Sequence, residues 1–227
     1  MTPKALLLDL DDTLIDTREG TRLALRDFHG THGHLMIGGL ADSEAAWDRG
    51  IKLHFPRYVR GEISFQEQRR GRIREIFARP DMPEAEADRL FKAYLDHCAG
   101  HYLLFKDVVG FLEALAGTPV AIVTNGSVEH QTLKLKLTGL DRRVPVIVIS
   151  EGVGMRKPQK EIFEYAARQL GVAPADCLMV GDNYEVDCLG SQSAGMQAIW
   201  INRFGSHFIP DGKIGIGSIS SLQNLAF

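Results

Sequence analysis

The sequence predicts an α/β protein: a doubly wound parallel sheet with a Rossmann-like core and an inserted α-helical domain. Three observations support this fold class. Short runs rich in Leu, Ile and Val recur and stop at polar or glycine-containing junctions, as parallel strands buried on both faces do. Helical patterns lie between these runs. One long segment interrupts the alternation, and its length suits an inserted domain better than a loop.

Five apolar runs are the expected strands, at residues 5–8, 120–123, 146–149, 177–180 and 198–201. Between the third and fourth runs, apolar residues repeat every four positions, which predicts a helix that starts after Pro158 and stops at Gly171. A similar stripe runs from Val108 to Leu115. The tail from Gly212 to Leu225 is expected to add a short strand and a terminal helical turn.

The interrupting segment extends from about Asp16 to Lys106 and contains no buried-strand run. Its apolar residues, among them Trp47, Phe77 and Phe91, instead recur at the spacing of amphipathic helices. The expected domains are therefore a core made of residues 1–15 and 107–227, and a helical domain made of residues 16–106.

The composition excludes several classes of partner. With 26 Lys and Arg against 29 Asp and Glu, the net charge is −3, so no long-range positive field attracts a nucleic acid polymer or an anionic membrane. The three cysteines are too few and too scattered for a disulfide framework or a zinc cluster. No stretch reaches the roughly 18 apolar residues of a membrane span, and the first residues lack the apolar length of a signal peptide. A cytoplasmic enzyme or binding protein is the resulting expectation.

Polar residues follow the expected strands directly. In an open parallel sheet, ligands bind beyond the carboxyl ends of the strands, so these side chains should meet at one edge. The residues concerned are Asp9 and Asp11 after the first run, Thr124, Asn125 and Gly126 after the second, Lys157 shortly after the third, and Asp182 and Asp187 after the fourth.

This set of side chains predicts phosphate chemistry with a metal ion. Crowded carboxylates repel one another unless a cation neutralises them, and ligands that offer only oxygen suit Mg²⁺. Lys157 and the Thr124 hydroxyl could then hold phosphate oxygens, and the backbone N–H groups of residues 124–126 are expected to point at the same anion. Residues two apart on a strand share a face, so Asp9 could attack phosphorus while Asp11 exchanges protons.

Four motifs in this order resemble those of the haloacid dehalogenase superfamily of phosphatases, and the resemblance covers nearly the whole chain. They are Asp-Leu-Asp-Asp-Thr-Leu at residues 9–14, Val-Thr-Asn-Gly at 123–126, Lys-Pro at 157–158, and Gly-Asp at 181–182 with Asp187. The resemblance implies that the helical insertion is the cap of that family, which closes over the site. The resemblance implies that Asp9 is the nucleophile and Asp11 the acid/base. It implies that the metal ligands are Asp9, the Asp11 backbone carbonyl and Asp182, and that Asp187 supports the metal or Lys157. The implied phosphate-binding residues are Thr124, Asn125 and Lys157.

The implied activity is Mg²⁺-dependent hydrolysis of a small phosphomonoester through an aspartyl-phosphate on Asp9, by a monomer or homodimer. Asp12 and residues 181–202 look like pyrimidine 5'-nucleotidase-like and N-acylneuraminate-9-phosphatase-like members. This likeness favours a nucleoside monophosphate or a sugar phosphate as the substrate. Substrate specificity is expected to reside in the cap, where Arg18, Arg57 and Tyr58 are the candidate residues.

Two alternatives stay open at this point. A phosphomutase of the same fold shares every motif, whereas dehalogenases and phosphonate hydrolases commonly lack an acid at the position of Asp11. From a different class, receiver domains combine acids, a Thr and a Lys on a doubly wound sheet, and they act as phosphorylation switches without multiple turnover. Receiver domains are shorter, and their phosphorylated aspartate lies on a later strand.

Overall fold

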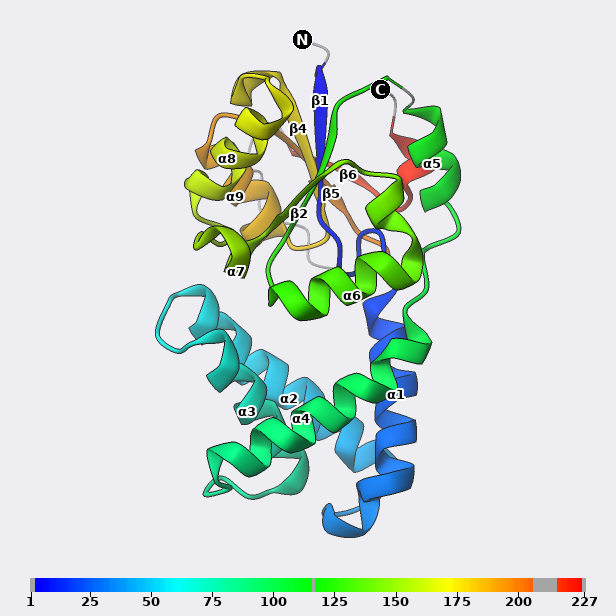
Figure 1. Ribbon diagram of the computed structural model, residues 1–227, viewed down its shortest axis with the longest axis vertical. Coiled ribbons are helices and arrows are strands. Elements are labelled where there is room, and N and C mark those ends of the chain that lie inside the picture. The colour runs from blue at the N-terminus through cyan, green and yellow to red at the C-terminus, as the bar shows by residue number, and fades with distance from the viewer. Residues whose placement is uncertain (1–2, 116, 206–215, 226–227) are drawn as a thin grey trace. The chain divides into compact units, whose positions relative to one another are not determined.

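The computed structural model describes residues 3–115, 117–205 and 216–225, and its contacts divide the chain into two compact units (Figure 1). The first unit comprises residues 1–16 and 103–227, and the second comprises Thr17–Tyr102. The second unit is shorter than the expected insertion because the chain already belongs to the first unit again from Leu103 onward. Ile15 forms an antiparallel bridge with Leu104, and the Phe105 N–H donates to the Leu14 carbonyl at 3.0 Å.

In its described residues, the first unit contains one six-stranded sheet in which every strand pair is parallel. The strand order is β3-β2-β1-β4-β5-β6. The strand bounds are β1 Ala5–Leu8, β2 Val120–Thr124, β3 Val146–Ile149, β4 Cys177–Gly181, β5 Gln197–Ile201 and β6 Ile216–Ile219. The five apolar runs therefore form strands as predicted. The expected tail strand is β6, and a single helical turn, η6 (Leu222–Asn224), follows it; residues 212–215 of that prediction lie outside the described residues.

The order of the strands explains where a ligand can bind. The chain passes from β1 to β2 to β3 in one direction and then returns to the other side of β1 as β4. Figure 1 shows the consequence, with α5 (Val108–Ala114) and α6 (Val128–Thr138) on one side of the sheet and α8 (Lys160–Leu170) and α9 (Gly190–Ser193) on the other. The doubly wound fold is confirmed. Its order reverses between β1 and β4, and the crevice at such a point is where ligands bind.

Burial on both faces holds the sheet together. Every residue of β1, β2 and β4 is buried. On one face, Leu7, Val123 and Met179 pack against Ile162 and Phe163 of α8. This helix ends at a glycine in the left-handed conformation, as its sequence predicts, because residue 171 has φ 71° and closes the last turn.

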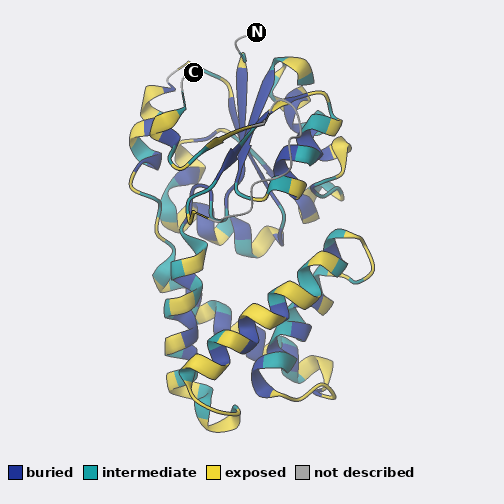
Figure 2. Ribbon diagram, turned by 180° about the vertical axis from the view of Figure 1, so that it is seen from behind, coloured by how far each residue is buried: buried dark blue, intermediate teal, exposed yellow. Residues whose placement is uncertain are grey.

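The second unit is entirely helical across its fully described residues. It contains α1 (Thr17–His32), η1 (Gly33–Leu35), α2 (Leu40–Val59), α3 (Phe65–Phe77), α4 (Glu84–Cys98) and η2 (Ala99–His101). Its own core includes Phe28, Trp47, Ile73, Phe91 and Tyr94, and Figure 2 shows the buried faces of these helices. The predicted helical insertion is therefore present. In the part of the chain that the structure describes, no helix combines the length and the apolar character that crossing a membrane would require.

Candidate active site

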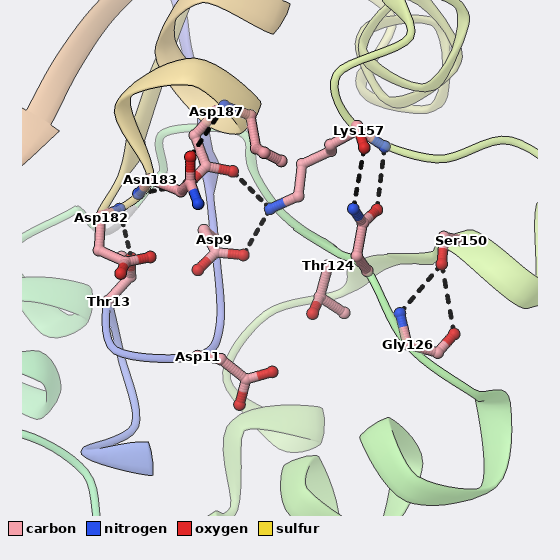
Figure 3. Close-up of polar contacts among 12 residues, drawn as sticks. Asp9, Asp11, Thr13, Thr124, Gly126, Ser150, Lys157, Asp182, Asn183 and Asp187 are labelled. Atoms are coloured by element: carbon pink, nitrogen blue, oxygen red, sulfur yellow. Dashed lines mark hydrogen bonds and ion pairs between the residues drawn. The ribbon is translucent and has the colours of Figure 1, made fainter. Parts of the chain in front are cut away.

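A buried lysine joins two buried carboxylates at the carboxyl end of the sheet (Figure 3). Asp9 follows β1 directly, and Lys157 lies between β3 and α8. The Lys157 Nζ atom lies 2.5 Å from Asp9 Oδ1 and 2.6 Å from Asp187 Oδ1. The three side chains are at most 8% exposed, so these charge-assisted hydrogen bonds are shielded from water. The sequence prediction that residues 9, 157 and 187 meet is thereby realised in space.

Asp187 is oriented by a single turn of π-helix, η5 (Tyr184–Leu189), which follows β4. Such turns are rare and are found frequently at functional sites. The Asn183 backbone N–H donates to Asp187 Oδ2 at 3.0 Å, and the Asn183 side chain caps the turn by accepting from the Val186 N–H at 3.0 Å. The turn thus leaves Asp187 Oδ1 directed at the lysine.

Three carboxylates gather in a way that could hold a cation. Asp9, Asp182 and Asp187 each offer an oxygen, and these oxygens lie within 4.8 Å of one another. The backbone around Asp182 is fixed, since its N–H donates to Thr13 Oγ1 at 3.1 Å and its carbonyl accepts from Trp200 Nε1 at 2.7 Å. A donor set made only of oxygen fits Mg²⁺. Compared with the predicted ligands, the cluster adds the Asp187 carboxylate, which the sequence placed in a supporting role.

The pKa values show why this cluster needs positive charge. Burial raises the pKa of Asp9 to about 7, Lys157 opposes the shift, and the nearby carboxylates of Asp187 and Asp11 add to it. Burial also raises the pKa of Asp182 well above its ordinary value, and the charges on Asp9 and Asp187 add to that effect. The pKa of Lys157 is raised as well, because the attraction of Asp187 and Asp9 outweighs burial. One ammonium does not offset two buried carboxylates and a third that is partly buried, so a divalent cation fits this site.

The Asp11 side chain points to a different set of partners. Lys134 Nζ lies 2.6 Å from Asp11 Oδ1, and Gln131 Nε2 donates to Asp11 Oδ2 at 2.9 Å. Strand β1 ends at Leu8, so the expectation that Asp9 and Asp11 share a face of a strand is wrong. Both residues lie in the loop after the strand, which turns at Asp12 through a left-handed φ of 57°. Figure 3 shows the Asp11 carboxylate apart from the Asp9–Lys157 pair.

Thr124 and Asn125 take up different tasks at the end of β2. Thr124 Oγ1 accepts from Gln131 Nε2 at 2.6 Å. The Asn125 side chain binds the backbone of Lys157 twice: Nδ2 donates to the Lys157 carbonyl, and Oδ1 accepts from the Lys157 N–H, each at 2.9 Å. Asn125 therefore holds the lysine in place, and a direct contact from Asn125 to phosphate stays a prediction.

The sequence predicts that the Gly126 N–H points at the phosphate, and the structure gives this N–H another partner. It donates to Ser150 Oγ at 3.0 Å, and the Ser150 hydroxyl donates back to the Gly126 carbonyl at 3.3 Å. The first backbone N–H of the next helix, α6, also has a partner: the Val128 N–H donates to Glu151 Oε2 at 2.8 Å. Segment 150–151, which follows β3, thus takes up the N–H groups of Gly126 and Val128.

Sequence reasoning missed Gln131, Lys134 and Ser150. A signal for the first two existed, because they lie three positions apart in the helix after the Thr-Asn-Gly motif, and so share one helix face. Sequence alone does not show that this face is buried. Ser150 gave no signal, because its partner depends on how the end of β3 lies beside β2.

The candidate specificity residues lie in the second unit. Arg18 is exposed near the start of α1. Arg57 forms an ion pair with Glu62 at 3.5 Å. Tyr58 is 7% exposed, and its ring packs edge-on against Phe65 with the centroids 5.2 Å apart. This packing gives Tyr58 a role in the core of the helical unit, and substrate contact by the three residues stays a prediction.

Comparison with known proteins identifies the family. Residues 3–195 match the model of the haloacid dehalogenase-like hydrolases, and the chain belongs to this family. The phosphatase resemblance inferred from the four motifs is confirmed at that level. Hydrolase membership and the position of Asp9 after the first strand also count against a receiver-type switch.

Curated relatives of the chain are phosphatases. The chain is 29% identical over 228 residues to a phosphoserine phosphatase from Thermus thermophilus, covering 88% of this chain and 89% of that protein. It is 34% identical over 170 residues to the pyrimidine 5'-nucleotidase YjjG from Escherichia coli, covering 74% of each. An N-acylneuraminate-9-phosphatase from Homo sapiens is 35% identical over 127 residues, covering 55% of this chain and 51% of that protein. The prediction of an enzyme of the phosphoric monoester hydrolase class is confirmed at the level of the class.

A solved structure with a similar fold is that of the HAD hydrolase YfnB from Bacillus subtilis, bound to magnesium. It superposes with a TM-score of 0.84 at 24% identity, covering 98% of this chain and 96% of that one. At this identity the likeness concerns the fold, and it supports the same arrangement of a parallel sheet with a helical insertion.

Proposed function

We propose that the chain hydrolyses a small phosphomonoester through a phosphoaspartate on Asp9. The observation that carries this proposal is the Lys157 ammonium held between Asp9 and Asp187, with Asp182 completing an oxygen cluster beside it. A buried carboxylate next to a lysine and a cation site is suited to attack an anionic phosphate, because the positive charges offset the repulsion. The family membership supports the same reaction class.

In the first half-reaction, the Asp9 carboxylate attacks phosphorus through the oxygen that does not contact Lys157. The bond from phosphorus to the ester oxygen breaks, and the electron pair stays with that oxygen. The protonated carboxyl group of Asp11 gives its proton to the leaving oxygen, which departs as an alcohol. Lys157 and the Thr124 hydroxyl hold the other phosphate oxygens during the attack.

In the second half-reaction, water attacks the phosphorus of the phosphoaspartate. The Asp11 carboxylate takes a proton from this water, the bond from phosphorus to Asp9 breaks, and its electron pair returns to the Asp9 carboxylate. Inorganic phosphate leaves, and Asp11 is protonated again for the next cycle. The two roles of Asp11 are the acid and base halves of a single proton exchange.

The metal site would be formed by Asp9, Asp182 and the Asp11 backbone carbonyl, with Asp187 close enough to contribute or to support Lys157. Bound there, Mg²⁺ would neutralise the carboxylates and the phosphate oxygens that they face. The raised pKa values of Asp9 and Asp182 support this assignment, because a cation restores the charged forms that the reaction uses.

The helical unit would act as the cap that supplies specificity. Caps exclude water before attack and admit it afterwards, so movement of Thr17–Tyr102 about the two connecting segments would be part of the cycle. The substrate is a small phosphorylated metabolite, with nucleoside monophosphates and sugar phosphates as first candidates. Phosphoserine is a further candidate because one relative is a phosphoserine phosphatase.

Replacing the nucleophile tests the proposal. Asp9→Asn should lower turnover of p-nitrophenyl phosphate in Mg²⁺ by at least about 10³-fold, since it removes the attacking group. Asp176→Asn is a matched control, because the same change is made beside the opposite end of β4, where Asp176 pairs with Lys4. Full activity in the Asp9 variant would contradict the proposal. Release of one inorganic phosphate per ester consumed separates a hydrolase from a phosphomutase.

A further inference from the structure

Two polar side chains of α6 are buried although they were not expected in the site. Gln131 is 1% exposed and Lys134 is 4% exposed. They lie three positions apart, so they share one face of the helix. A lysine is almost never buried unless its charge is paired, so this face of α6 must be matched to an acidic partner.

The acidic partner is the Asp11 carboxylate, and it is held from two directions. Its Oδ1 lies 2.6 Å from Lys134 Nζ, and its Oδ2 accepts from Gln131 Nε2 at 2.9 Å. Because each oxygen has its own donor, the carboxylate cannot rotate without breaking one of the two contacts. The Asp11 side chain is 31% exposed, so packing alone does not fix it.

Gln131 also reaches the phosphate-binding side of the site. The same Nε2 donates to Thr124 Oγ1 at 2.6 Å. A hydroxyl group that accepts from an amide must direct its own proton elsewhere, so this contact leaves the Thr124 proton available to an anion. Gly126 makes room for the arrangement, because a Cβ atom there would lie 2.7 Å from Gln131 Cγ.

We propose that Lys134 and Gln131 are positioning residues: Lys134 aligns the Asp11 carboxylate for proton exchange, and Gln131 aligns both Asp11 and the Thr124 hydroxyl. The inference rests on the proposed function, since it assigns a purpose to contacts with the expected acid/base and phosphate-binding residues. The physical reason is that proton transfer and anion binding depend on placing each group within a fraction of an ångström.

The first test compares two leaving groups. Nitrophenolate leaves readily without a proton, whereas the alkoxide of an alkyl phosphate such as glycerol phosphate needs one to leave as an alcohol. Lys134→Met should therefore lower kcat/KM for glycerol phosphate by roughly 10- to 100-fold, part of the range that proton transfer contributes, and lower it for p-nitrophenyl phosphate by less than about threefold. The ratio of the two constants does not depend on how much of the preparation is folded, so a folding defect cannot imitate this result.

Lys136→Met is the matched control, because the same change is made on an exposed position of the same helix. It should leave both constants and their ratio as in the wild type. An equal loss on the two substrates in Lys134→Met, or no loss on either, would overturn the role of Lys134.

The second test separates the task of Gln131 from that of Lys134. Gln131→Met removes the donor to Thr124, so competitive inhibition by inorganic phosphate should weaken several-fold, whereas Lys134→Met should leave that inhibition constant unchanged. Gln131→Glu should lower kcat/KM more than Gln131→Met does, because glutamate has nearly the volume of glutamine and sets a second carboxylate against Asp11. Unchanged phosphate inhibition in Gln131→Met, or equal effects of the two Gln131 variants, would overturn the role of Gln131.

The outcomes distinguish this inference from the proposed function. If the wild-type chain hydrolyses neither ester in Mg²⁺, the proposed function itself fails. If the wild type turns over both esters and Asp9→Asn does not, while the Lys134 and Gln131 variants behave as the control, only the positioning inference fails.

Discussion

Replacing Gly181 with alanine tests how closely the site is packed. Gly181 ends β4, and its φ is not in the left-handed region, so alanine could adopt the backbone conformation. The site lacks the space for an added Cβ atom. An added Cβ would lie 2.5 Å from Asp187 Cγ and 2.6 Å from Asp187 Cβ, closer than real Cβ atoms approach other atoms. Asp187 would have to move, although it is 1% exposed and bonded to Lys157 and Asn183.

The expected cost follows from these contacts. Overpacking a core typically costs about 1–3 kcal/mol. Loss of one hydrogen bond to a charged group adds about 1.5–3 kcal/mol. A destabilisation of about 3 kcal/mol would lower the thermal midpoint of a chain of this size by roughly 6–12 °C. Activity should fall as well, because Lys157 loses one of the two carboxylates that hold it.

Circular dichroism melting and p-nitrophenyl phosphate turnover would measure both effects. Gly110→Ala is the matched control: this glycine is exposed within α5, and no atom lies within 4 Å of an added Cβ. The control should be neutral or stabilising by up to about 1 kcal/mol, since alanine favours the helix. A Gly181→Ala protein that melts within about 1 °C of the wild type and retains full turnover would refute the packing argument.

Three further predictions concern the cation and the lysine. Added Mg²⁺ should raise the thermal midpoint of the wild type, and Asp182→Asn should reduce that rise, as a Mg²⁺ titration of the melting curve would reveal. In chelator-treated protein, the pKa of Asp9 is about 7 against an ordinary 3.8, so the folded state keeps a proton that the unfolded chain loses. The contribution of Asp9 to stability is then present at low pH and is lost as the pH rises from about 4 to about 7. The unfolding free energy should therefore fall across that window. Saturating Mg²⁺ should flatten this dependence of the unfolding free energy on pH. Asn125→Ala removes both side-chain bonds to the Lys157 backbone, and it should lower kcat/KM by roughly 10-fold or more through displacement of the lysine; unchanged kinetics would show that the lysine is held by other contacts.

Much of the fold could be predicted because its physical requirements are local. A strand buried on both faces must be almost wholly apolar, and this produces the short Leu, Ile and Val runs that became β1, β2 and β4. The runs that became β3 and β5 are also apolar, although these strands are partly exposed. Parallel strands place their carboxyl ends at one edge, so Asp9, Lys157 and Asp182 could be expected together before any contact was known. The helical insertion followed from the change of apolar period after Asp16.

The sequence by itself determined the strands, the helical insertion and the edge of the sheet at which acids and a lysine gather. Only the tertiary structure decided which groups pair there. Asn125 binds the backbone of a residue 32 positions away, and Asp11 binds a lysine 123 positions away. Spacing along the chain fixes periodicity within an element, whereas such pairings depend on distances between elements. These distances are set by packing across the sheet and along α6, which is why Gln131 and Lys134 emerged only from the structure.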